Sequence, residues 1–151
     1  MSGGLWIIGY GNPGRRDDGF GFHVASQLRA RFGDRESITI RSLHQLDPTL
    51  AEELGRADEV VFVDASVEEH EGAVAWRKVL PEQGMLPPMT HHLKPSFLMG
   101  LVRMIEGRCP EAWLVSAQGE DFGVGEGLSP SAEKMAEQAA EEIASHVLAR
   151  G

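Results

Sequence analysis

Residues 7–24, IIGYGNPGRRDDGFGFHV, join a short apolar run to a segment with helical spacing, and this stretch decides how the chain folds. Residues 9–14, GYGNPG, satisfy the pattern G-x-G-x-x-G of a dinucleotide-binding turn. Such a turn uses bare backbone amides and positive charge to hold phosphate. Here Asp17 and Asp18 follow the glycines instead. The stretch predicts a strand, a loop and a helix, and raises the question whether the loop holds a phosphate or presents a carboxylate to something positive.

The composition is that of one globular domain covering residues 1–151. A formal net charge of −9 argues against a protein that binds a phosphate backbone, so we expect no nucleic-acid partner. No segment has the run of about 18 apolar residues that a membrane helix needs, and the N-terminus lacks the charged start of a signal peptide. Cys109 is the only cysteine, which excludes an internal disulfide. We therefore expect a cytoplasmic protein with no membrane partner.

Short apolar runs alternate with helical patterns along the chain. Strands are expected at residues 5–9, 37–43, 59–64, 73–80 and 112–117. Helices are expected at residues 18–31, from an N-cap at Asp47, at 95–106, and from a cap at Ser129 or Ser131 to the end. This alternation predicts an α/β fold, a three-layer αβα sandwich around a five-stranded, mostly parallel twisted sheet. Because residues 65–72 are too few for a parallel crossover, the fourth strand should run antiparallel, at or near an edge.

Three groups of potential ligands lie at the expected carboxyl ends of the strands, where an open α/β sheet binds its ligands. They are Asp17 and Asp18 after the first strand, Asp64 at the end of the third, and His91 and His92 before a helix. Each has a structural alternative, because an aspartate or histidine beside a helix can cap it and a carboxylate at a strand end can accept backbone hydrogen bonds. Together, two carboxylates and an imidazole form an O,O,N ligand set that suits divalent nickel or zinc. The negative charge of the carboxylates disfavours binding of a pyrophosphate, so we expect no organic cofactor.

Four motifs in this chain resemble those of the [NiFe]-hydrogenase maturation endopeptidases, which remove a C-terminal extension from the hydrogenase large subunit. They are GNPGRRDDGFG, FVDAS, THHLKP followed by FLMGLVRM, and DFGVGEGLSP, in the order that the family has them. They span residues 8–130, nearly the whole chain. One motif alone is only moderately specific, whereas the four in order are a strong signal.

The resemblance implies a site and a mechanism in outline. Mapped by motif, the metal-contacting and catalytic residues are Asp18, Asp64 and His91, with His92 as the alternate histidine. Many family members have Glu where this chain has Asp18. The implied metal is nickel, supplied by the substrate and used as the recognition handle for cleavage. The implied partner is the immature large subunit, and the protein is expected to be a monomer. Whether the metal also acts in catalysis, as in a metal-dependent rather than an aspartyl-type peptidase, stays open.

Two other functions remain as alternatives. One is a nickel-dependent chaperone or checkpoint that binds the immature subunit without cutting it, since no nucleophile or base stands apart from the proposed metal ligands. The other is a peptidyl-tRNA hydrolase, which the opening IIGYGNPG resembles. The catalytic histidine of that family is missing, because this chain has Asp17 and Asp18 after Arg16. An acidic protein also suits tRNA poorly.

Residues 119–130, GEDFGVGEGLSP, allow two interpretations as well. Their glycines favour a flexible rim loop that closes over a peptide, with Glu120 and Asp121 as acids that support the site. The alternative is a turn-rich approach to the last helix. The acidic surface of the chain would favour a cationic peptide segment.

Overall fold

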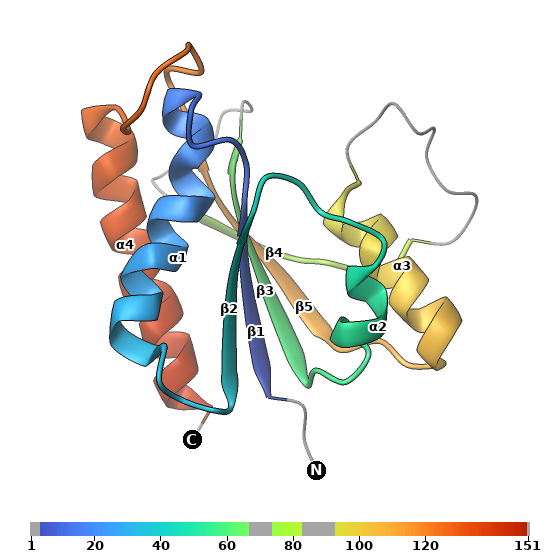
Figure 1. Cartoon of the computed structure of the whole chain (residues 1–151). Helices are drawn as coiled ribbons and strands as arrows, with labels where there is room; N and C mark the ends of the chain where they lie inside the picture. The colour runs from blue at the N-terminus through green and yellow to red at the C-terminus, as the bar shows by residue number, and fades with distance from the viewer. Residues whose placement is uncertain (1–3, 67–73, 83–92, 151) are drawn as a thin grey trace.

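The computed structural model describes residues 4–66, 74–82 and 93–150, and a five-stranded sheet forms its centre (Figure 1). The strands are β1 (Leu5–Tyr10), β2 (Ile38–Leu43), β3 (Glu59–Ser66), β4 (Ala75–Lys78) and β5 (Glu111–Gln118). Their order across the sheet is β2-β1-β3-β5-β4. Four strands, β1, β2, β3 and β5, run parallel to one another. The fifth, β4, pairs antiparallel with β5 at one edge of the sheet. The predicted antiparallel edge strand is confirmed.

Helices cover both faces of the sheet. The described helices are α1 (Phe20–Phe32), α2 (Leu50–Leu54), α3 (Pro95–Glu106) and α4 (Pro130–Ala149). A 3₁₀ turn at Arg16–Gly19 precedes α1. Figure 1 shows α1 and α4 on one face and α2 and α3 on the other. This arrangement confirms the predicted α/β sandwich.

The two layers of packing explain the unbroken apolar runs of β1 and β3. In β1, Leu5 and Ile7 pack with residues of α1 and α4, whereas Trp6 and Ile8 pack with residues of α2 and α3. These four side chains are 9% exposed or less. A strand that is buried on both faces needs apolar residues at every position, which is why neither strand alternates.

Two glycines of the opening motif serve packing and turn geometry. A Cβ on Gly9 would overlap the carbonyl oxygen of Gly21, so α1 can lie directly against the end of β1 only because Gly9 has no side chain. Gly11 has a φ of 138°, which residues with a side chain rarely adopt. The glycine spacing that resembles a dinucleotide-binding turn therefore has a structural role in this chain.

The second helix begins later than expected. α2 starts at Leu50 with Thr49 at its N-cap, so the prediction that Asp47 is the N-cap is wrong. The Asp47 carboxylate instead accepts hydrogen bonds from the backbone N and the Oγ1 of Thr49, each at 2.8 Å. Such a bond two residues along stabilises a turn, and here the turn lies just before the helix.

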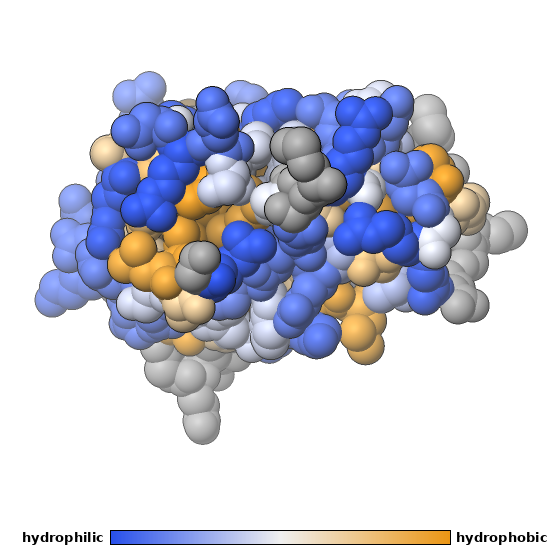
Figure 2. Space-filling view, turned by 90° about the horizontal axis from the view of Figure 1, so that it is seen from below, coloured by the Kyte–Doolittle hydropathy of each residue, from blue (hydrophilic) through white to orange (hydrophobic). Residues whose placement is uncertain are grey.

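The two ends of the sheet differ. Figure 2 shows the lower end, where the four parallel strands begin, with hydrophobic areas visible between hydrophilic side chains. The loop that follows β1 lies at the opposite, upper end (Figure 1). Among the described residues, no helix has the length and hydrophobicity required to span a membrane.

Candidate active site

The carboxyl ends of β1 and β3 lie side by side at one end of the sheet. There the strand order reverses, because β2 lies on one side of β1 and β3 on the other, and such a point is where open α/β sheets bind ligands. A cavity of about 180 Å³ opens at this point, and Asp18 and Asp64 both line it. The structure thus brings together the two carboxylates that the sequence singled out. The cavity is also lined by Tyr10, Gly11, His44, Gln45, Leu46 and Leu93.

Asp18 is held in the 3₁₀ turn before α1 by its own loop. Its Oδ2 accepts a hydrogen bond from the backbone N of Asn12 at 2.8 Å. It does not cap α1, since the N-cap residue is Gly19 and no side chain accepts a hydrogen bond there. The Asp18 carboxylate is partly exposed and keeps lone pairs for a ligand.

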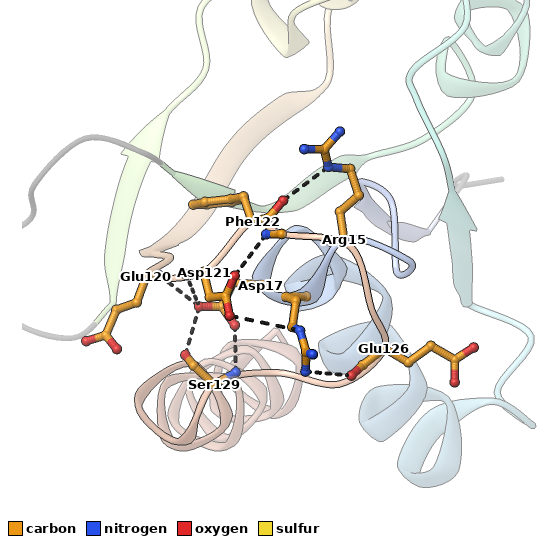
Figure 3. A network of polar contacts seen from close by, with 9 residues as sticks. Arg15, Asp17, Glu120, Asp121, Phe122, Glu126 and Ser129 are labelled. Carbon is orange, nitrogen blue, oxygen red and sulfur yellow. Dashed lines mark hydrogen bonds and ion pairs between the residues drawn. The ribbon is translucent and has the colours of Figure 1, made fainter.

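Asp17 has the opposite environment from its neighbour. Its side chain is 0% exposed and accepts hydrogen bonds from the backbone N of Glu120 at 2.8 Å and of Asp121 at 3.1 Å. The backbone N and the Oγ of Ser129 also donate to it, at 2.7 and 2.8 Å (Figure 3). Burial opposes ionisation of this carboxyl, but the four hydrogen bonds outweigh burial and lower its pKa. Asp17 is therefore an ionised structural clamp.

This clamp also determines which serine caps α4. Ser129 is the N-cap, because its Oγ accepts a hydrogen bond from the backbone N of Ala132 at 3.3 Å while it donates to Asp17. The cap prediction is thus confirmed for Ser129, whose Oγ lies 3.4 Å from that of Ser131. The start of the last helix is joined through Asp17 to the loop that carries Asp18.

The segment between β5 and α4 is fastened to the same loop at further points. The backbone N of Arg16 donates to the carbonyl oxygen of Gly125 at 2.9 Å, and the Nε of Arg15 donates to that of Phe122 at 3.2 Å. Arg16 itself has a φ of 50°, a strained value for a residue with a side chain. These contacts favour the interpretation of residues 119–130 as a tied approach to α4.

Glu120 and Asp121 have a structural role in the same segment. They contribute backbone N–H groups to Asp17, and their side chains are exposed. The Asp121 carboxylate lies 3.9 Å from the Nε of Arg16. Neither residue lines the cavity that contains Asp18. Within the described residues, their contribution is the backbone N–H groups that hold Asp17, and a supporting role for their carboxylates stays a prediction.

Asp64 lies at the end of β3 and is the most perturbed acid at this site. Burial and the nearby charge of Asp18 raise its pKa from 3.8 to about 7, although hydrogen bonds from the backbone of Ala65 and the hydroxyl of Tyr10 act in the other direction. Burial and the charge of Asp64 raise the pKa of Tyr10 as well, so its hydroxyl keeps its proton and donates to the carboxylate. A buried carboxyl whose ionisation is opposed by a second carboxylate beside it is one that a divalent cation would stabilise in its charged form.

The third predicted ligand falls outside the described part of the chain. His91 and His92 both lie between residues 82 and 93, where the structure describes nothing, so the choice between them stays a prediction. Within the described ranges, no group of three or more His, Cys, Asp or Glu side chains is arranged to hold a metal ion. Leu93, which directly follows the two histidines in sequence, lines the cavity.

His44 lines the same cavity and was missed by the sequence analysis. It follows β2, is exposed, and its ring makes an edge-to-face contact with Phe22 at 5.6 Å between centroids. Its place directly after a predicted strand, at the edge that carries Asp18 and Asp64, was the available signal.

A second, larger cavity of about 480 Å³ shares Tyr10 and Asp64 with the first and extends from them toward β4 and the start of α3. A substrate that contacts Asp64 can therefore extend in two directions.

The sequence matches no family model and no curated protein sequence. Its fold is similar to several solved structures. The [NiFe] hydrogenase maturation protease HycI from Thermococcus kodakarensis KOD1 is 26% identical, with a TM-score of 0.76 over 96% of this chain and 92% of that one. The hydrogenase maturating endopeptidase HybD from E. coli is 19% identical, with a TM-score of 0.73 over 98% and 94%. The hydrogenase 2 maturation peptidase of a Thaumarchaeota archaeon is 18% identical, with a TM-score of 0.67 over 95% and 97%.

These similarities cover nearly the full length of both partners in each comparison. All three structures share the fold of this chain, and the maturation protease that is 26% identical confirms the family resemblance that the four motifs indicate, and with it the predicted class of enzyme.

Proposed function

We propose that this chain, which has the fold and the motifs of a [NiFe]-hydrogenase maturation endopeptidase, removes the C-terminal extension of a hydrogenase large-subunit precursor after nickel insertion. Asp18, Asp64 and His91 recognise the nickel that the precursor already carries, with His92 as the alternate histidine. The nickel belongs to the substrate, no organic cofactor takes part, and the enzyme acts as a cytoplasmic monomer.

The observation that carries this proposal is the meeting of Asp18 and Asp64 in one cavity at the point where the strand order reverses. Their mutual repulsion is part of what raises the pKa of Asp64 to about 7. A divalent cation favours the ionised form of both carboxyls and so removes this conflict. The pair therefore suits a cationic centre that arrives with the substrate.

The residues around the pair have supporting roles in this proposal. The backbone N of Asn12 orients Asp18, and the hydroxyl of Tyr10 orients Asp64 by donating a hydrogen bond to it. Substrate-bound nickel would supply a fixed positive charge beside the peptide bond that is cut. Binding there places the end of the large subunit at the mouth of the larger cavity, which shares Asp64.

The test is a processing assay with purified protein and nickel-loaded precursor. Mass spectrometry should detect a shortened precursor with a new C-terminus, and nickel-free precursor should remain uncut. Asp18→Asn should lower the rate by at least about 100-fold, because it removes one of two charges that contact the metal. Asp34→Asn is the matched control, since Asp34 is exposed and lies in the turn before β2, at the other end of the sheet. Full activity of Asp18→Asn would refute the assignment.

The same assay separates the enzyme from a nickel-dependent chaperone or checkpoint. A chaperone would form a stable complex with the nickel-loaded precursor and leave its mass unchanged.

A further inference from the structure

The larger cavity has a charge pattern opposite to that of the smaller one. One end of it is Asp64 with Tyr10, and the rest lies between β4, β5 and the start of α3. It is lined by Ser66, Arg77, Lys78, Lys94, Ser96 and Ser116 together with apolar residues. In a chain with a net charge of −9, Arg77 and Lys94 present two cationic side chains to this cavity against one acid, Asp64.

The side chains of Arg77 and Lys94 have no hydrogen bond or ion pair within the described residues, and both are exposed. Lys78 differs from them, since its Nζ lies 3.9 Å from an oxygen of Glu111 and 5.8 Å from the centre of the Trp113 ring.

The alternation of β4 explains this difference. Arg77 pairs with Leu114, which packs in the core on the α2 and α3 side, whereas Lys78 pairs with Trp113. Directly paired residues on antiparallel strands point to the same face. Arg77 therefore faces the cavity beside α3, and the ammonium group of Lys78 lies on the opposite face of the sheet.

The start of α3 adds positive potential to the same place. The helix begins at Pro95, and its N-cap residue, Lys94, accepts no capping hydrogen bond with its side chain. Its first turn contains no acidic residue. The carboxylate of Glu82 accepts a hydrogen bond from the Oγ of Ser96, in the first turn of α3, at 2.7 Å, but Glu82 does not line the cavity. The amino end of a helix of this length favours an anion.

We propose that this cavity binds a carboxylate of the substrate peptide through Arg77 and Lys94, next to Asp64. This inference rests on the proposed function, because it assigns the cavity to the C-terminal extension. The extension offers two sources of a carboxylate, its terminal carboxyl group and its acidic side chains. The site as a whole is then polarised, with a cation bound between Asp18 and Asp64 and an anion bound beside α3. This polarity fixes the direction in which the peptide lies.

This proposal differs from the cationic peptide that the acidic composition led us to expect. The overall acidity of the chain favours a basic partner at long range, but the side chains that line the cavity are those that contact the peptide.

The test measures binding of a fluorescent synthetic peptide with the sequence of the extension, by anisotropy, so that cleavage is not required. Arg77→Ala and Lys94→Ala should each weaken binding by about 5-fold, and the double variant by more, because each removes one exposed charge contact. Lys78→Ala is the matched control, being one residue away on the same strand with its charge on the other face, and it should bind as the wild type does. Binding should also weaken as salt increases.

Two altered peptides identify the source of the carboxylate. Amidation of the C-terminus removes the terminal charge, and Asp→Asn with Glu→Gln replacement removes the side-chain charges. Loss of affinity with either peptide supports the proposal and names the group. Equal affinity for a peptide that carries both changes, equal weakening by Lys78→Ala, or no binding to the wild type at millimolar peptide would overturn it.

Processing of the nickel-loaded precursor is measured in parallel. In the double variant KM should rise while kcat stays within about 2-fold of wild type, because the cations contact a remote part of the substrate. If the wild type binds the peptide through Arg77 and Lys94 but never cuts the precursor, the proposed function fails and the carboxylate site stands. If the wild type cuts and the double variant has an unchanged KM, the carboxylate site fails and the proposed function stands.

Discussion

The structure predicts that Asp64→Asn stabilises the fold while it removes the proposed activity. In the unfolded chain this carboxyl has its ordinary pKa of 3.8, and in the folded protein burial and Asp18 raise the pKa to about 7. Between these values the folded state binds more protons than the unfolded state, so the ionisable side chain lowers stability as pH rises. Asparagine has nearly the same shape, stays neutral, and still accepts the hydrogen bond from Tyr10.

The magnitude follows from the shift of about three pKa units. At about 1.36 kcal/mol per unit, the penalty removed by Asp64→Asn is up to about 4 kcal/mol above pH 8 and approaches zero near pH 4. For a chain of 151 residues this corresponds to a rise in Tm of roughly 10 °C at pH 8. The gain should grow steadily between pH 4 and pH 7.

Urea unfolding of the wild type and of Asp64→Asn at pH 4.5, 6 and 8 measures this gain, with the slope of the transition as the check that both unfold in the same way. A gain of the same size at all three pH values would show that packing rather than ionisation is responsible. A loss of stability at pH 8 would refute the assignment of Asp64 as a carboxyl whose ionisation the fold opposes.

Three further variants separate the roles of the neighbouring groups. Asp17→Asn should lower the free energy of unfolding by about 3 kcal/mol at pH 7, because an amide N–H would face the donors that now bind the carboxylate. The loss should shrink as pH falls below the usual range of an aspartate pKa, and urea unfolding at several pH values would measure it. Asp18→Asn should lower the pKa of Asp64, since it removes the second cause of the shift, and NMR titration of the carboxyl carbon reads this directly. His91→Ala should abolish processing of nickel-loaded precursor and His92→Ala should retain it, and equal activity of the two variants would undo the ranking between them.

The fold could be predicted largely from local patterns in the sequence. The continuous apolar runs of β1 and β3 are typical of strands buried on both faces, and the short connection between β3 and β4 indicated the antiparallel edge. The error at Asp47 has the same local origin, because an Asp-Pro pair suits both a helix start and the turn that precedes one.

The division of roles between Asp17 and Asp18 could not be predicted in this way. The two residues are identical and adjacent, and what separates them is contact with backbone groups more than 100 residues away in sequence. The 3₁₀ turn directs one carboxylate toward the start of α4 and the other toward the cavity. His44 was missed for a related reason: its place after a predicted strand suggested the correct end of the sheet, but the strand order was needed to put it in the same cavity as Asp18.

The residues of the glycine loop have distinct roles in the fold and at the cavity. Gly9 and Gly11 allow α1 to lie against β1 and the chain to turn, while the buried Asp17 fixes the loop and Asp18 faces the cavity. The loop thus presents a carboxylate, and it does so opposite Asp64, whose ionisation the fold resists. Under the proposed function, a bound cation would favour the ionised form of Asp64. The free energy that the fold loses at this site near neutral pH would then be recovered on binding a metal-loaded partner, which would make binding selective for that partner. Under the proposed function, a precursor without metal would leave the repulsion in place, and this would give a physical basis for cleavage only after nickel insertion.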